Sequence, residues 1–139
     1  MRTITHIVIH CSATRQTAMV QSIQNHWRNV LKWKNPGYQV LIDANGTIHR
    51  LAPDSAICNG VAGHNQTSLH VSYIGGVDRQ NRPVDNRTPQ QIAAMIQVIN
   101  DWLKLYPSAI VQGHRDFPNV KKACPSFDAR AWWRTVQGK

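Results

Sequence analysis

The chain has 139 residues, 42% of them hydrophobic and 17% charged, which predicts a single globular domain spanning residues 1–139. A domain of this size buries roughly two thirds of its unfolded surface, so it needs neither disulfides nor a structural metal in order to fold. Sixteen Lys and Arg against seven Asp and Glu give a net charge of +9, which favours polyanionic partners such as nucleic acid or an anionic cell envelope.

The first predicted elements are a strand and a helix. Residues 4–9 are apolar and β-branched, which is typical of a buried strand. From Val20 onwards, apolar side chains recur at helical spacing as far as Leu31. Pro36 and Gly37 end this helix, because proline cannot continue it and glycine permits a turn.

A hairpin and a long loop follow. Residues 38–42 and 47–51 are predicted strands, joined by the turn signal Asn45-Gly46. Residues 53–70 show little periodicity and contain many polar residues and glycines. We interpret this segment as a loop with a functional or packing role.

The second half of the chain adds further strands and two helices. Residues 71–74 are a predicted strand, and the segment from Thr88 to Gln91 is a strong helix start with a capping box. Residues 109–111 are a short predicted strand, and a last helix is expected to begin near Ser126. Because strands and helices alternate around one clear hairpin, we predict an α/β fold with a single mixed β-sheet flanked by helices.

Three residues are candidates for a metal site. His10 lies at the end of the first predicted strand, His114 follows the last one, and Cys124 comes ten residues later. A catalytic zinc commonly takes three protein ligands and leaves one position open. Spacing alone also allows His10 to be an ordinary histidine at a strand end and Cys124 to be a small buried apolar residue.

The order of several short motifs resembles a known family. These motifs are IVIHCSAT at residues 7–14, PGY at 36–38, NGT at 45–47, GHN at 63–65, YIGGVD at 73–78, GHRD at 113–116 and KACPSFD at 122–128. They resemble the type-2 N-acetylmuramoyl-L-alanine amidases, in particular small phage lysozymes and prophage amidases. The animal peptidoglycan-recognition proteins, which share that fold, are similar too. The resemblance extends from about residue 4 to about residue 130.

The resemblance implies a role for each candidate. It implies that His10, His114 and Cys124 bind zinc, and that Tyr38 and Lys122 lie over the metal. A lysine there can stabilise an oxyanion, and a tyrosine can orient water or move a proton. The alternatives are a surface lysine and an ordinary strand aromatic.

Other residues have weaker expected roles. His64 and Asn65 are expected to line the substrate groove, although His64 can equally have a packing role. Cys11 and Cys58 are expected to be structural thiols. Gln39 replaces a histidine often found in the family, and His70 replaces a glycine. We expect His70 to add a bulky side chain beside the groove and to leave the metal site intact.

The resemblance implies that the chain is a zinc-dependent amidase that cuts peptidoglycan between N-acetylmuramic acid and L-alanine, as a phage or prophage endolysin. The alternatives are a peptidoglycan-binding module without activity and a regulator that binds a polymerase. We expect a monomer that contacts peptidoglycan and the anionic envelope. We expect no specific nucleic-acid partner, because no stacking aromatics accompany the basic residues.

The expected location follows from the cysteines and the N-terminus. Three irregularly spaced cysteines argue against a disulfide framework. The N-terminal residues run straight into a predicted strand, so we expect no signal peptide. No apolar run approaches the roughly 20 residues that span a bilayer. We therefore expect cytoplasmic synthesis, with release or export needed to reach a cell wall.

Overall fold

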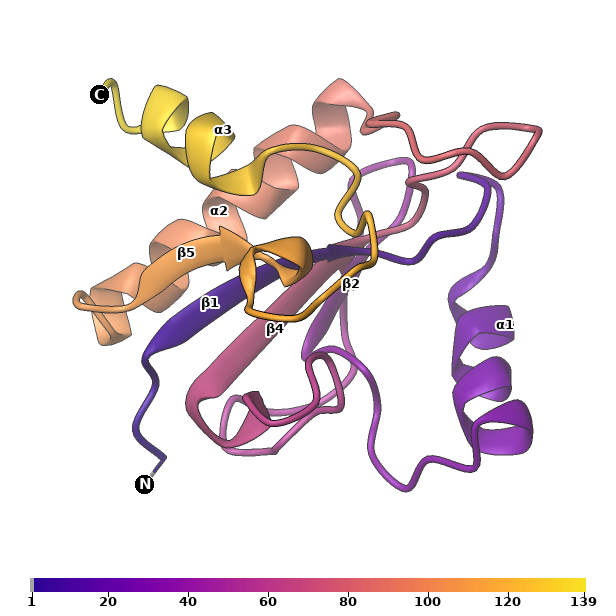
Figure 1. Ribbon diagram of the computed structural model, residues 1–139, viewed down its shortest axis with the longest axis horizontal. Helices are drawn as coiled ribbons and strands as arrows, with labels where there is room; N and C mark the ends of the chain where they lie inside the picture. Colours follow the sequence, from indigo (N-terminus) through magenta and orange to yellow (C-terminus); the bar gives the residue numbers. More distant parts are fainter. Residues whose placement is uncertain (1) are drawn as a thin grey trace.

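The computed structural model describes residues 2–139 and is built around one five-stranded sheet (Figure 1). The strands are β1 (His6–Cys11), β2 (Val40–Ile42), β3 (Ile48–Arg50), β4 (Ser68–Tyr73) and β5 (Ile110–Gly113), in the spatial order β3-β2-β4-β1-β5. β1 pairs in parallel with both β4 and β5, and β2 pairs in parallel with β4. The predicted hairpin forms the antiparallel pair of β2 and β3, so the predicted mixed sheet is confirmed.

Within residues 2–139, three α-helices and three short turns of other helix types accompany the strands. They are α1 (Val20–Asn25), the π-helical turn η1 (His26–Val30), the 3-10 turns η2 (Asn65–Thr67) and η3 (His114–Asp116), α2 (Pro89–Leu105) and α3 (Ala129–Val136). In the part of the chain from residue 2 onwards, no helix combines the length and apolar character required to cross a bilayer.

The predicted capping box of α2 is confirmed. The Thr88 hydroxyl accepts a hydrogen bond from the Gln91 backbone N–H at 3.1 Å, and the Gln91 side chain accepts one from the Thr88 N–H at 2.9 Å. These two bonds satisfy backbone donors that a helix otherwise leaves without partners. The side-chain amide of Gln91 also donates to the carbonyls of Ile42 and Ile74, which ties the start of α2 to the sheet.

Several predicted boundaries were wrong by a few residues. β4 begins at Ser68, three residues before the predicted strand at 71–74. The prediction missed these residues because Ser68 and His70 are polar and interrupt the apolar pattern, although the structure buries both. The helix that begins at Val20 is an α-helix only as far as Asn25. It continues as a π-helical turn, in which the Leu31 N–H donates to the His26 carbonyl five residues earlier. α3 begins after Asp128, whose side chain accepts from the Ala131 N–H at 3.1 Å.

The two faces of the sheet are covered differently. α2 and α3 cover one face, where the largest apolar cluster includes Ile9, Tyr73, Met95, Trp102 and Trp133. α1 stands apart from these helices on the other side of the molecule (Figure 1). It contributes to a smaller cluster with Trp27, Leu41 and Ile74. Side chains alternate along a strand, so Ile9 and Cys11 face α2 and His10 faces the opposite side.

Candidate metal centre

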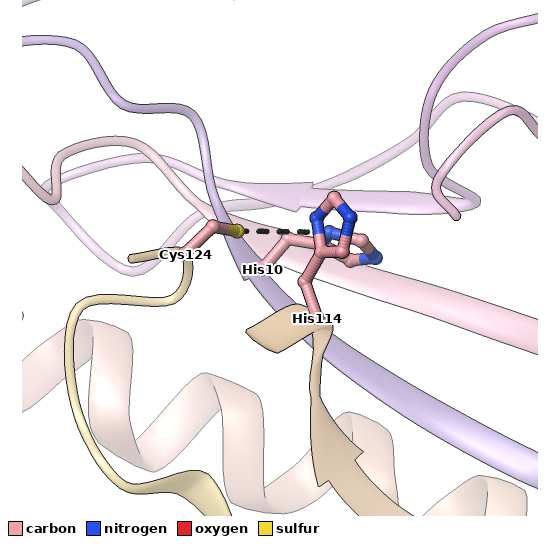
Figure 2. Close-up of side chains that lie close together, drawn as sticks. All are labelled: His10, His114 and Cys124. Atoms are coloured by element: carbon pink, nitrogen blue, oxygen red, sulfur yellow. Dashed lines mark hydrogen bonds between the residues drawn. The ribbon is translucent and has the colours of Figure 1, made fainter. Parts of the chain in front are cut away.

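The three predicted metal ligands converge at one edge of the sheet. His10 is the penultimate residue of β1, and His114 immediately follows β5, the parallel neighbour of β1. The carboxyl ends of parallel neighbours meet at the same edge, and the ring centroids of the two histidines are 5.0 Å apart. Cys124 approaches from the loop before α3, and its Sγ lies 3.7 Å from His10 Nδ1 (Figure 2).

Backbone contacts hold the Cys124 loop against the sheet. The Arg115 N–H donates to the Cys124 carbonyl at 2.9 Å, and the Cys11 N–H donates to the Cys124 sulfur at 3.2 Å. The Tyr73 hydroxyl donates to the Pro125 carbonyl at 2.7 Å. A Cβ at Gly113 would lie 2.7 Å from the Pro125 ring, so a glycine at the end of β5 is what lets the loop come this close.

The donor set suits a zinc ion. One ligand atom from each of His10, His114 and Cys124 can be chosen so that all lie within 4.8 Å of one another. Two imidazole nitrogens and one thiolate are ligands that zinc prefers, and a set of three leaves a position for water or substrate. Within residues 2–139 this is the one cluster of three or more His, Cys, Asp or Glu side chains that could hold a metal ion.

The electrostatics keep both imidazoles neutral. Burial lowers the pKa of His10 well below its usual value, and the neighbouring groups His70, His114 and Lys122, which would repel a charge on His10, lower it further. Burial and the charge of Lys122 lower the pKa of His114 to about 4. The hydrogen bond with Cys11 and burial raise the pKa of Cys124, so a metal cation must displace a proton from this sulfur.

Tyr38 lies beside the predicted ligands. Its ring is 5.0 Å from the ring of His10 and packs edge-on against Trp27 at 5.3 Å. Its hydroxyl donates to the Cys11 carbonyl at 3.2 Å. Burial and the nearby sulfurs of Cys124 and Cys11 raise the pKa of Tyr38, so the hydroxyl keeps its proton at neutral pH.

Lys122 is exposed two residues before Cys124. Its positive charge acts on all three predicted ligands, because it lowers the pKa values of His10, His114 and Cys124. The structure thus brings the charge of this residue to the same edge of the sheet as the donor set.

The two residues expected to line a groove have partners within the protein. The His64 ring packs against Phe117 in a tilted arrangement with a centroid distance of 4.5 Å, a contact of the kind expected from the packing role considered as its alternative. The Asn65 side chain points to the backbone N–H of Val61 and to the ring of His70. Their contact with substrate stays a prediction.

Sequence reasoning missed the position of His70. It was expected beside the groove, but its side chain is fully buried in β4 and its Nδ1 lies 2.9 Å from His10 Nε2. The backbone N–H of His70 donates to the Gln39 side chain at 2.8 Å, so the two departures from the family pattern contact each other. The sequence signal that could have pointed to this contact was that both Gln39 and His70 depart from the family pattern.

Comparisons with known proteins agree on one family. A family model described as N-acetylmuramoyl-L-alanine amidase matches residues 1–127. The endolysin of Enterobacteria phage K11 is 35% identical over 128 residues, which cover 91% of this chain and 83% of the relative.

Solved structures share the fold. The Ph2119 endolysin of a Thermus scotoductus bacteriophage superimposes with a TM-score of 0.82 at 22% identity, covering 100% of this chain and 88% of that one. Drosophila PGRP-LB superimposes with a TM-score of 0.77 at 16% identity, covering 97% of this chain and 82% of that one. The predicted fold class is thereby confirmed.

Proposed function

Because the chain belongs to the N-acetylmuramoyl-L-alanine amidase family, we propose that it uses a zinc ion held by His10, His114 and Cys124 to cut peptidoglycan between N-acetylmuramic acid and L-alanine. The family match and the endolysin relatives support a peptidoglycan amidase. The phage origin of those relatives supports a role as a phage or prophage endolysin. The net charge of +9 favours approach to an anionic envelope.

The observation that carries this proposal is the convergence of the three donor atoms within 4.8 Å. A module that only binds peptidoglycan has no need of two neutral imidazoles and a thiol on one sheet edge. The intact donor set therefore favours hydrolysis over recognition alone. A regulator that binds a polymerase, the other alternative, would not require this cluster either.

The surrounding residues can divide the chemistry between them. A zinc ion bound by this donor set would polarise the scissile carbonyl and acidify a water molecule. The Lys122 ammonium carries its charge close to the donor set and can stabilise the oxyanion that forms at the carbonyl. The Tyr38 hydroxyl keeps its proton and can pass one towards the amine of the departing L-alanine. His10 and His114, being neutral, remain available as ligands throughout.

Mass spectrometry of purified peptidoglycan after digestion tests the bond that is cut. Hydrolysis of the proposed amide releases stem peptides with a free N-terminal L-alanine and leaves sugar strands with a free lactyl carboxylate. New reducing sugar ends would instead identify a glycosidase. Stem peptides cut between amino acids would identify a peptidase. Either result would contradict the proposal, as would unaltered wall.

Lys122→Ala should lower turnover about 10²–10³-fold, the typical cost of removing one oxyanion donor. Because Lys122 is an exposed side chain that supplies charge and no ligand atom, zinc content should stay that of the wild type. Turnover on purified wall and metal analysis together check this prediction. Lys121→Ala removes the adjacent exposed lysine and is the matched control, with near-normal turnover expected. If both variants behave alike, Lys122 is an ordinary surface lysine.

A further inference from the structure

The predicted ligand His10 is held by its second ring nitrogen. Its Nδ1 faces the sulfur of Cys124 at 3.7 Å, and its Nε2 lies 2.9 Å from Nδ1 of His70. Both histidines are fully or almost fully buried, so water does not readily replace either nitrogen in the contact between them. The position of the proton on the His10 ring therefore depends on the partner of the second ring nitrogen of His70, Nε2.

Asn65 fixes the direction of the hydrogen bonds. Its Oδ1 accepts from the Val61 backbone N–H at 2.8 Å and lies 3.0 Å from His70 Nε2. A backbone N–H can only donate, so the Asn65 atom at this position is the carbonyl oxygen of the amide. This oxygen can only accept, and His70 Nε2 must therefore carry a proton.

The remaining proton positions follow. A neutral imidazole carries a proton on one nitrogen only, so His70 Nδ1 offers a lone pair to His10. Burial favours this neutral form, because the His70 side chain is fully buried and a charged imidazolium would lose its hydration there. His10 Nε2 must then donate, which places the lone pair of His10 on Nδ1, the atom that faces Cys124.

The backbone around His70 is built to hold its ring there. The His70 N–H donates to the Gln39 side chain at 2.8 Å, and the Gln39 N–H donates to the His70 carbonyl at 3.1 Å. A Cβ at Gly60 would lie 2.3 Å from His70 Nδ1, so the glycine at this position leaves the space that the imidazole occupies. Gln39 thus holds the backbone of His70, and Gly60 leaves room for its ring.

We propose that His70 and Asn65 are positioning residues that set the tautomer and orientation of His10, with its proton on Nε2 and its lone pair on Nδ1 directed at the metal position. This inference rests on the proposed zinc site for its functional meaning. Partners of this kind hold a ligand ring in place and raise its basicity, and their loss typically weakens metal binding about 10–100-fold.

The tautomer can be measured in the full chain after its metal is removed. Long-range ¹H–¹⁵N correlation spectra of histidine side chains distinguish an Nε2–H ring from an Nδ1–H ring. We expect single Nε2–H forms for both His10 and His70 in the wild type, and mixed tautomers of His10 in His70→Ala. A wild-type His10 with its proton on Nδ1 would overturn the inference, whether or not the chain binds zinc.

Zinc affinity, measured by competition with a chromophoric chelator, tests the positioning role. Asn65→Leu keeps the size of the side chain but removes the acceptor, and we expect it to weaken zinc binding about 10–100-fold. Asn65→Asp restores an acceptor oxygen and should recover most of the wild-type affinity. Ser68→Ala removes a buried hydroxyl from the same strand, one that donates to the His64 carbonyl, and should leave zinc affinity unchanged.

The outcomes separate this inference from the proposed function. If Asn65→Leu and Asn65→Asp both bind zinc like the wild type, the two residues do not position His10 and the inference is wrong. If the wild-type chain binds no zinc, the proposed metal site fails, and the spectra of the metal-free chain still decide the tautomer. If His70→Ala fails to fold, the Asn65 pair supplies the decision alone.

Discussion

Cys124→Ser is expected to abolish wall hydrolysis and to remove bound zinc from the protein. A serine hydroxyl stays protonated and neutral at physiological pH, whereas a cysteine becomes a thiolate that binds zinc strongly. The sulfur contacts the backbone N–H and carbonyl of Cys11, whereas the other backbone contacts of the loop do not involve it, so the substituted side chain should remain in place. Metal analysis after dialysis and turnover on purified peptidoglycan measure the two effects.

The control for this change is another cysteine. Cys58 is buried and lies outside the cluster of predicted ligands. Cys58→Ala should lower stability and keep the wild-type zinc content per folded chain. Full zinc occupancy in Cys124→Ser, measured under the same dialysis conditions, would show that this sulfur is not a ligand.

Tyr38→Phe should fold normally, keep its zinc and lose about 10²–10⁴ in rate, the range typical of general acid–base assistance. Hydrolysis of an amide needs a proton for the leaving amine, and the Tyr38 hydroxyl retains one at neutral pH. Phenylalanine preserves the ring contacts with His10 and Trp27 and removes only the hydroxyl that donates to the Cys11 carbonyl. Single-turnover rates with saturating wall fragments isolate the chemical step.

Tyr106→Phe is the matched control, because Tyr106 follows the last turn of α2 and is not among the predicted site residues. Its turnover should equal that of the wild type. Undiminished hydrolysis by Tyr38→Phe would mean that water and Lys122 manage the protons without the hydroxyl. A loss of zinc in Tyr38→Phe would point to a structural effect at His10 instead.

The sequence alone determined the elements with strong local signals. The capping box at Thr88 and the hairpin around Asn45-Gly46 depend on residues a few positions apart, so their patterns carry the local backbone preference directly. The motifs also determined the family and the residues to test as zinc ligands. The structure brings those residues together, and zinc binding by them remains a prediction.

Only the tertiary structure decided where β4 begins and what surrounds His10. Ser68 and His70 are polar, so their pattern indicated a loop, but the neighbouring strands bury them in the sheet. The bond between His10 and His70 joins residues 60 positions apart, and it requires β1 to lie beside β4 in a particular register. For strands this far apart in the chain, order and register arise from packing of the whole sheet, because no tight turn joins β1 to β4 and sets their pairing locally. For that reason the sequence could mark His70 as a departure, while the fold alone placed its ring against the ligand.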